Sequence, residues 1–415
     1  MHRNRPTLGK TTIFALLLVA VILTVSCGTN PTGPGILVVE LAADIYTGSS
    51  PNDGEPSFLF SFNNILYFRA KDADGNELWS FDGIIASQVD DINSSGDGLH
   101  PTSFTEFFAI FNNELYFRAN NGTNGYELWE YSGSGLPNQI PYEINPAVGG
   151  SSFPFYPTVL GTKLYFGATD GTNGYELWEY SGSSAPPEMV RSFNINAGAL
   201  NSNPYYLTVF NGVLYFQADD GSGTELWEYT GTSDPSKVDD LNGGVGGSGP
   251  KFLTVFDNKL YFTADDGTHG FELWEYDGTL PLTLFDIDTG GDSNPAYLTV
   301  FNNKLYFQAD GGSNGVELWV YDGTNSPSEV ADINPLGNSN PQYLTVFNNV
   351  LYFAADDGIN GMELWQYNGS DAPSLVEDIN TSGDSNPQYL TVCNGKLYFQ
   401  ASDGSDIELW MVYYK

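Results

Sequence analysis

The residues best suited to chemistry are glutamates at a fixed position of a repeated tripeptide. Glu-Leu-Trp occurs eight times, and each glutamate precedes its tryptophan by two residues. In a β-strand, side chains two residues apart lie on the same face, so each carboxylate faces the side that packs its tryptophan. A carboxylate in such a place needs donors or a cation. The eight residues are Glu77, Glu127, Glu176, Glu225, Glu272, Glu317, Glu363 and Glu408.

Two interpretations of these glutamates stay open. Backbone N–H groups of the neighbouring Asp/Gly/Asn loop can satisfy the carboxylates, or the carboxylates can share a cation with aspartates of that loop. Hard oxygen ligands of this kind suit Ca²⁺. However, residues 72–75 (Asp-Ala-Asp-Gly) match only the start of a calcium loop, and the second repeat has Asn120 and Asn121 instead. The candidate metal ligands are Asp72, Asp74, Glu77, Asp219, Asp220, Glu225, Asp265, Asp266, Glu272, Asp356, Asp357 and Glu363.

A second acidic set lies near the end of the fourth strand of each repeat. Because successive strands alternate in direction, the loops after the second and fourth strands of each repeat emerge on the same side, so these side chains are expected to form an acidic rim. The rim is either a solvated face or a binding surface. Its members are Asp44, Asp91, Glu143, Asp240, Asp286, Asp332 and Asp378.

The search for catalytic residues is mostly negative. After the N-terminal segment the chain has only His100 and His269, which lie in different repeats, so a multi-histidine metal site is not expected. No nucleophile motif such as Gly-x-Ser-x-Gly stands out. Paired carboxylates for glycoside cleavage stay open, because 51 acidic residues make suitable pairs inevitable. We therefore expect a protein that is not an enzyme.

The repeat predicts how these residues are positioned. The eight tryptophans lie 45 to 50 residues apart, and Leu-Tyr-Phe also occurs eight times. In one unit, strands are expected at Gln342 to Phe347, Val350 to Ala355, Met362 to Tyr367 and Leu375 to Asn380. Asn348 and Asn349 form the first hairpin turn, because asparagine tolerates positive φ. Units of four short strands at this period are typical of a β-propeller.

The two ends of the chain predict the number of blades. Ile36 to Ile45 resembles a fourth strand, whereas only five residues follow the last Glu-Leu-Trp. The N-terminal strand should therefore complete the last blade and leave no unpaired edge. We expect an all-β, eight-bladed propeller of four-stranded blades over residues 36–415. The tryptophans are assigned to packing between blades.

The charge excludes some partners. With 14 basic and 51 acidic residues, the formal net charge is -37. Such a chain repels nucleic-acid backbones and anionic lipid headgroups. Aromatic residues make up 15% of the chain, which is too many for an acidic disordered protein. We expect a soluble and monomeric domain.

The N-terminus predicts export. Basic residues at 3, 5 and 10 precede an apolar run from Ile13 to Val25, which is too short to span a bilayer. Residues 23–28 (Leu-Thr-Val-Ser-Cys-Gly) resemble a bacterial lipobox, although Thr24 stands where an aliphatic residue is usual. We expect a signal peptide at 1–26, lipidation of Cys27 and a flexible tether over 27–35. Cys393 replaces a phenylalanine of the repeat and is expected to be a buried apolar filler.

The motifs resemble those of bacterial secreted proteins with ELWxxDGT repeats, a family regarded as propeller-like. Residues 272–279 (Glu-Leu-Trp-Glu-Tyr-Asp-Gly-Thr) match the repeat most closely, and the resemblance covers nearly all of residues 36–415. Blade 3 departs from it with Leu160-Gly161-Thr162, and blade 8 lacks the Asp-Gly turn. A looser similarity is to eight-bladed quinoprotein-like propellers. Those dehydrogenases would be expected to use adjacent cysteines, which this chain lacks.

These observations lead to one favoured hypothesis and two alternatives. The favoured one is a non-catalytic, lipid-anchored propeller in the bacterial cell envelope, at the outer membrane or cell surface, that binds an envelope protein or glycan. Its membrane contact would be through the lipid alone, and secretion without an anchor is the other location. The first alternative is a Ca²⁺-stabilised adhesive or matrix protein. The second is a carbohydrate-active enzyme with a carboxylate pair in a central or rim pocket.

Overall fold

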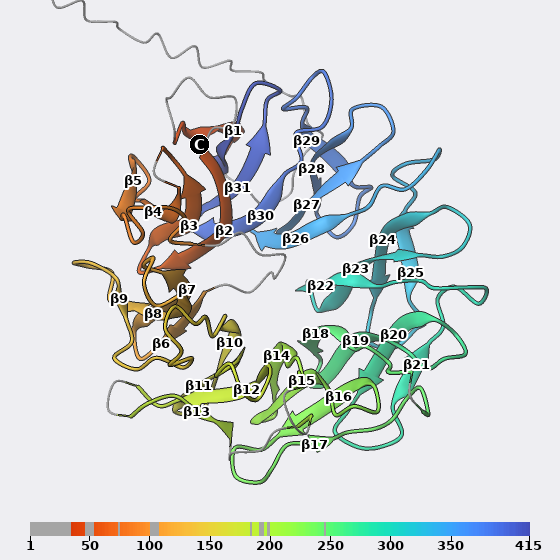
Figure 1. Ribbon diagram of the computed structural model, residues 1–415. Helices are drawn as coiled ribbons and strands as arrows, with labels where there is room; N and C mark the ends of the chain where they lie inside the picture. Colours follow the sequence, from red (N-terminus) through yellow and green to blue (C-terminus); the bar gives the residue numbers. More distant parts are fainter. Residues whose placement is uncertain are drawn as a thin grey trace, which may run out of the picture.

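The computed structural model describes residues 35–45, 54–73, 75–99, 108–182, 185–190, 195–196, 200–244 and 246–415. All 32 elements assigned there are strands, and they form eight antiparallel sheets of four strands each. The sheets stand radially around a common centre, and the chain passes once around the ring (Figure 1). This confirms the all-β, eight-bladed propeller predicted from the repeats.

Each blade consists of four strands that are consecutive in the chain, except blade 8. Blade 1 comprises β2 (Gly54–Phe62), β3 (Ile65–Lys71), β4 (Asn76–Phe81) and β5 (Ala86–Asp90), and blade 2 comprises β6 (Ala109–Phe111), β7 (Glu114–Asn120), β8 (Tyr126–Tyr131) and β9 (Asn138–Gln139). Blade 3 comprises β10 (Phe155–Leu160), β11 (Lys163–Ala168), β12 (Glu176–Tyr180) and β13 (Glu188–Met189), and blade 4 comprises β14 (Tyr205–Phe210), β15 (Val213–Asp219), β16 (Thr224–Tyr229) and β17 (Ser236–Lys237).

The second half of the ring repeats this order. Blade 5 comprises β18 (Lys251–Phe256), β19 (Lys259–Asp265), β20 (Phe271–Tyr276) and β21 (Thr283–Phe285), and blade 6 comprises β22 (Ala296–Phe301), β23 (Lys304–Asp310), β24 (Val316–Tyr321) and β25 (Ser328–Ala331). Blade 7 comprises β26 (Gln342–Phe347), β27 (Val350–Asp356), β28 (Met362–Tyr367) and β29 (Ser374–Glu377), and blade 8 comprises β30 (Gln388–Cys393), β31 (Lys396–Ser402), β32 (Ile407–Tyr414) and β1 (Leu37–Ala43). The fourth strands are shorter than the sequence predicts.

The ring closes through the two ends of the chain, as predicted. Strand β1 pairs antiparallel with β32, so that Val38 lies opposite Tyr413 and Leu41 opposite Trp410. Ile36 and Lys415 exchange two backbone hydrogen bonds beyond the strands, of 3.0 and 3.1 Å. The last blade therefore presents a completed sheet, and its β32 is not left as an open edge.

The first strand of each blade lies innermost, and the innermost strands of successive blades contact one another from β10 through β30 to β2. The first strand of each blade joins the second strand by a tight hairpin. In blade 7, Asn348 and Asn349 form this hairpin, with φ values of 47° and 60°. These values belong to the turn type that the asparagines predict. The first strand also carries a bulge, because the register shifts between Gln342 and Thr345.

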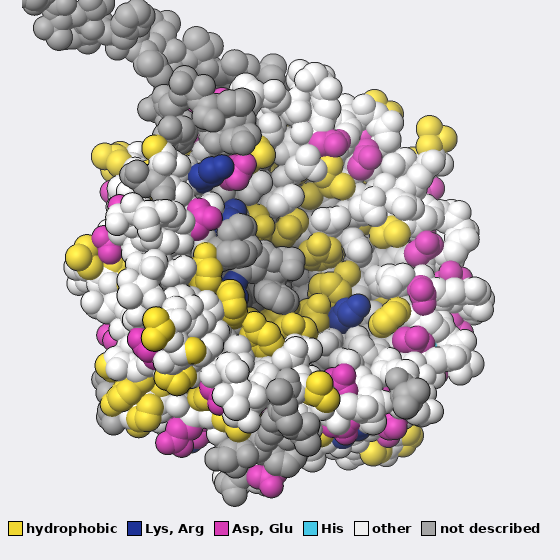
Figure 2. All heavy atoms as spheres, viewed as in Figure 1, with side chains coloured by type: hydrophobic (Ala, Val, Ile, Leu, Met, Phe, Trp, Pro, Cys, Tyr) yellow, Lys and Arg dark blue, Asp and Glu magenta, His cyan; other side chains and the backbone are white. Residues whose placement is uncertain are grey.

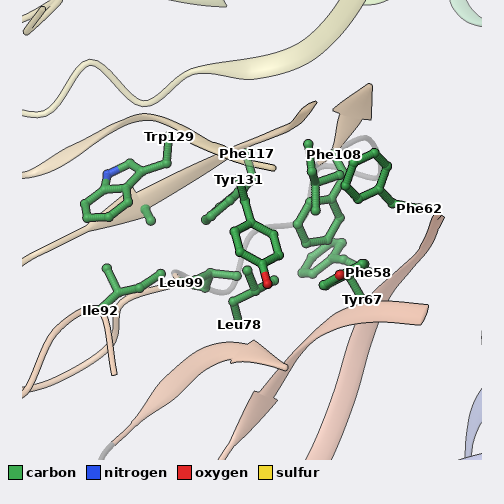
Figure 3. Close-up of a cluster of buried hydrophobic side chains, with 12 residues drawn as sticks. Phe58, Phe62, Tyr67, Leu78, Ile92, Leu99, Phe108, Phe117, Trp129 and Tyr131 are labelled. Atoms are coloured by element: carbon green, nitrogen blue, oxygen red, sulfur yellow. The ribbon is translucent and has the colours of Figure 1, made fainter. Parts of the chain in front are cut away.

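The core consists of apolar clusters that join neighbouring blades. Figure 3 shows one of them, in which Leu78 of blade 1 lies among Phe117, Trp129 and Tyr131 of blade 2. Trp129 is 7% exposed, and truncating a tryptophan in such a place costs roughly 3–5 kcal/mol. The tryptophans therefore pack between blades, as predicted. Cys393 is likewise buried in such a cluster, with its thiol free.

The expected N-terminal features lie outside the described residues. The signal peptide, Cys27 and the tether up to residue 34 belong to this part of the chain, and so does Asp74 of the predicted metal ligands. Export, lipidation and envelope location therefore stay predictions. Within the part of the chain that the structure describes, no helix has the length and apolar character needed to cross a membrane.

Candidate functional site: an aromatic central channel

The repeated glutamates are buried and hold the connections between blades. The Glu127 carboxylate accepts hydrogen bonds from the backbone N–H groups of Ile144 (3.0 Å) and Ser152 (3.1 Å) and from the Ser152 hydroxyl (2.8 Å). Burial raises the pKa of Glu77, Glu127 and Glu176 to about 7. The donors lie in the loop after the fourth strand, not in the loop before the glutamate as the sequence analysis proposed. These carboxylates are satisfied by the protein itself.

The loop aspartates are separate from the glutamates. Asp219 accepts from the N–H of Gly221 at 2.7 Å, and Asp357 accepts from the N–H groups of Ile359 and Asn360. Asp266 accepts from the N–H of His269 and contacts its ring nitrogen Nδ1 at 2.8 Å. Among the residues that the structure describes, no three His, Cys, Asp or Glu side chains gather as metal ligands would. The calcium site stays a prediction.

The acidic rim lies at the surface. Six of its seven members are exposed, and Asp378 is half-buried. Nothing in their arrangement distinguishes a binding surface from a solvated face, so a binding role for the acidic rim stays a prediction.

A ring of aromatic side chains at the centre of the propeller is the feature that sequence reasoning missed. Among the described residues it has one member from each of seven blades, because the corresponding part of blade 2 lies outside the described ranges. Every member lies at the bulge of a first strand. All seven have left-handed backbone conformations, with φ between 50° and 58°. We call this set the channel ring: Phe58, Tyr156, Tyr206, Phe252, Tyr297, Tyr343 and Tyr389.

Members of the channel ring contact one another in sequence around the axis. The centroids of successive rings are 5.1 to 5.8 Å apart from Tyr156 to Tyr206 and on through Tyr389 to Phe58, and their planes are tilted by 39° to 54°. Aromatic pairs favour separations and tilts of this kind. The contacts therefore fix each ring against its neighbours.

Threonine hydroxyls near the channel ring form hydrogen bonds with backbone carbonyl groups. Thr345, two residues after Tyr343, lies 3.1 Å from the carbonyl oxygen of Tyr343 and 3.1 Å from that of Leu390 in the next blade. The pattern recurs around the ring, and it joins the last blade to the first where Thr391 donates to Leu59 at 3.0 Å. These hydrogen bonds hold the bulge in place and use the threonine hydroxyls within the protein.

Six of the seven members of the channel ring, all except Tyr156, line a cavity of about 400 Å³ on the axis of the propeller. Leucines and threonines of the innermost strands complete its wall, together with Phe60 and Phe108. Figure 2 shows the hollow at the centre of the disc, surrounded mainly by hydrophobic side chains. The volume falls within the range of about 300–1,000 Å³ that ligand pockets occupy.

Three phenol groups give this apolar channel its polar contacts. The hydroxyls of Tyr297, Tyr343 and Tyr389 have no hydrogen-bond partner among the described residues. Burial raises the pKa of all three, so they are neutral and can both donate and accept. They come from three successive blades and therefore form one arc of the wall.

Comparisons with known proteins show the fold. No protein-family model matches the chain, and a comparison with curated proteins finds no match. Among solved structures, a puromycin-hydrolyzing peptidase of Mycobacterium tuberculosis aligns with 87% of this chain and 60% of its own, at 11% identity and a TM-score of 0.53. A structure from a study of two prolyl endopeptidases aligns with 84% and 54%, at 12% identity and a TM-score of 0.51. The chain thus spans little more than half of each.

These comparisons correct the functional hypothesis drawn from the sequence. The sequence predicts a non-catalytic platform for an envelope protein or glycan, with a Ca²⁺-stabilised adhesive or matrix protein or a carbohydrate-active enzyme as alternatives. The structures of similar fold are instead those of peptidases, so that hypothesis is wrong. At such low identity the likeness establishes the shared propeller and no activity for this chain.

Proposed function

We propose that this protein is a peptidase-related propeller whose central channel binds an extended peptide segment. The channel handles the peptide chain, and no residue described above is assigned to peptide-bond cleavage. The proposal joins the fold shared with the peptidases to the geometry of the channel ring. The aromatic walls would pack against apolar side chains, and the phenol groups would hydrogen-bond to the peptide backbone.

The observation that carries this proposal is the backbone conformation of the channel ring. A residue with a side chain in the left-handed region costs about 1–2 kcal/mol. Glycine or asparagine would reduce this cost, yet the ring has tyrosine or phenylalanine at all seven positions. Strain of this kind persists where the surrounding structure enforces it, and it gathers at functional sites. The bulge aims an aromatic side chain at the axis, where a ligand can contact it.

The chemistry of the wall favours a peptide over a sugar. The rings are tilted against their neighbours, so they form no flat platform on which a sugar ring could stack. The threonine hydroxyls already serve backbone carbonyls, which leaves few donors for the many hydroxyls of a glycan. A peptide needs fewer polar contacts, and these are what the arc of Tyr297, Tyr343 and Tyr389 offers.

Fluorescence anisotropy with labelled peptides tests the proposal. An apolar hexapeptide should bind saturably, whereas a Ser/Asp-rich hexapeptide of equal length should not. The triple variant Tyr297→Phe, Tyr343→Phe and Tyr389→Phe keeps the aromatic surface and removes the three hydroxyls. It should weaken binding by about tenfold, the equivalent of one or two hydrogen bonds.

The matched control removes hydroxyls at buried tyrosines between blades. Tyr306→Phe and Tyr352→Phe should leave peptide affinity unchanged, because these side chains are buried in clusters between blades and do not line the cavity. Absence of saturable binding, or a triple variant that binds as tightly as the parent protein, would contradict the peptide-binding channel.

A further inference from the structure

The blades differ from one another at one level of the channel, which consists of the residue directly before each channel-ring residue and the residue paired with it. In each blade the former lies on the innermost strand and the latter on the second strand. Seven blades show the pair in register: Ser57 with Arg69, Phe155 with Gly167, Tyr205 with Gln217, Lys251 with Thr263, Ala296 with Gln308, Gln342 with Ala354, and Gln388 with Gln400. Two of these pairs contain a cation.

Arg69 is buried beside the channel ring and forms no ion pair with a carboxylate in the described part of the chain. Its side chain is 8% exposed, and its Nε donates to the Ser57 hydroxyl at 2.7 Å. The guanidinium carbon lies 5.7 Å from the centre of the Phe58 ring. Tyr389, Glu55 and Asp97 act electrostatically on the cation without an ion pair. No ion pair of Arg69 occurs among the described residues. Arg69 thus contacts or influences two members of the channel ring.

Lys251 lies at the same level in blade 5. It directly precedes Phe252 of the channel ring, and its Nζ is 4.8 Å from the centre of the Phe271 ring. It too forms no ion pair with any described residue. Because eight blades follow one another around the axis, blades 1 and 5 face each other across it. Figure 2 shows Lys and Arg side chains on opposite sides of the central hollow.

The second arginine in the described part of the chain occupies the position of Arg69 in the next blade. Arg118 is 5% exposed, and its guanidinium carbon lies 5.9 Å from the centre of the Phe153 ring. Burial lowers its pKa to about 10, while Tyr126 and Tyr175 act on it electrostatically. Both described arginines are therefore held at one level, beside aromatic rings.

This placement contrasts with the charge balance of the chain. The sequence has 51 acidic residues and only 14 basic ones. Three lysines away from this level pair with carboxylates, namely Lys163 with Glu179, Lys237 with Asp220, and Lys259 with Glu275. Arg69 and Lys251 form no ion pair with any described residue, although Glu55 and Asp97 act electrostatically on Arg69. Because a buried cation is unfavourable without a counter-charge in direct contact, Arg69, together with the half-buried Lys251 at the same level, provides a place for an anionic group of a ligand.

We propose that the end of the channel bounded by Arg69 and Lys251 binds the C-terminal carboxylate of a peptide. This inference rests on the proposed peptide-binding function and specifies the class of peptide. Apolar side chains of the peptide would lie against the channel ring. The C-terminal carboxylate of the peptide would lie at the next level, which contains Arg69 and Lys251. The strongly negative protein repels polyacidic ligands, so a single carboxylate on an apolar chain is the ligand that fits.

Paired peptides test this assignment. The same apolar hexapeptide, labelled at its N-terminus, is prepared with a free C-terminal carboxylate and as the C-terminal amide. Anisotropy titrations should show the free acid binding about tenfold more tightly than the amide, the equivalent of one charge-assisted contact. Arg69→Gln and Lys251→Gln should each reduce this preference, and Arg69→Lys should restore part of it.

Lys304→Gln is the matched control. The substitution removes the same charge, but Lys304 begins β23 at the hairpin end of blade 6. It should leave the preference for the free acid intact. Lys251 is only half-buried, so its variant remains informative if Arg69→Gln lowers the melting temperature. Equal binding of acid and amide by the parent protein overturns the carboxylate site and leaves the peptide channel standing. If neither peptide binds, the proposed function itself fails.

Discussion

The strain in the channel ring can be measured by comparing two truncations at one position. Tyr343 has a φ of 54° and is half-buried. Tyr343→Ala and Tyr343→Gly remove the same ring and the same phenol group. They differ only in the Cβ atom, which is unfavourable in the left-handed region for alanine and absent in glycine. The difference between the two variants therefore isolates the backbone contribution.

The expected magnitude follows from that Cβ atom. In the left-handed region the penalty is about 1–2 kcal/mol, while glycine loses about 0.5–1 kcal/mol through its greater freedom in the unfolded chain. We expect Tyr343→Gly to be more stable than Tyr343→Ala by about 1 kcal/mol. Both variants lose the contacts with Tyr297 and Tyr389, which lie 5.6 and 5.5 Å away between ring centroids. That loss cancels in the comparison.

Urea denaturation of the purified protein gives the free energy of unfolding of each variant. Val346 provides the control, because it lies on the same strand β26 and is 37% exposed. At Val346 the order should reverse, with alanine more stable than glycine by about 0.5–1 kcal/mol. If alanine were the more stable residue at both positions, the left-handed strain would not exist and the argument for a functional ring would lose its basis.

Three further predictions test other parts of the molecule. Deleting residues 36–43 removes β1 and leaves β32 as an open edge, so the melting temperature should fall by about 5 °C or more in calorimetry; an unchanged value would contradict closure through the chain ends. Burial raises the pKa of Glu127 from 4.5 to about 7, so its contribution to stability is present below pH 4.5 and is lost as the pH rises through 7. The melting temperature should therefore be higher at pH 5 than at pH 8, and Glu127→Gln should reduce the difference. A Cβ added at Gly167 would lie 2.1 Å from the Phe155 ring, so Gly167→Ala should cost about 1–3 kcal/mol in urea denaturation, whereas Gln400→Ala at the same position of blade 8 should cost less.

Much of the fold could be predicted from the sequence, because the repeats encode it locally. The Glu-Leu-Trp and Leu-Tyr-Phe motifs specify two strands of every blade, and paired asparagines in four blades specify the hairpin between the first two strands. The partial repeats at the two ends specify which strands must meet. Only the lengths of the fourth strands differ, since β9, β13 and β17 contain two residues each. These strands pair at the outer edge of the sheet, where little packing enforces them.

The donors to the buried glutamates were harder to predict. The sequence places an Asp/Gly/Asn loop next to each glutamate, which suggests a local contact. In the structure the Glu272 carboxylate instead accepts from Ile287 at 2.8 Å and from Ser293 at 3.0 Å, 15 and 21 residues further along the chain. That contact depends on how the fourth strand folds back onto the third. The spacing of residues within a single motif contains no such information.

The channel ring was missed because a bulge changes the direction of one side chain. With regular alternation, Tyr343 would lie on the same face as Thr345 and Phe347, between blades. The register shift between Gln342 and Thr345 removes this equivalence and turns the ring toward the axis. A signal was nevertheless present, because an aromatic residue stands four residues before the end of nearly every first strand. The repetition of this aromatic residue in successive first strands was the signal that could have revealed the site.

The channel illustrates how a nearly symmetric protein can recognise an asymmetric ligand. Eight similar blades place equivalent side chains around one axis, which suits the channel ring but gives a ligand no preferred direction. Direction requires a second level at which the blades differ, and the pairs that contain Arg69, Phe155 and Lys251 form such a level. An extended peptide also has two different ends. If the level next to the channel ring binds one of them, the propeller fixes the direction in which the peptide enters, and the chain therefore needs variation at only this level of each repeat to become selective.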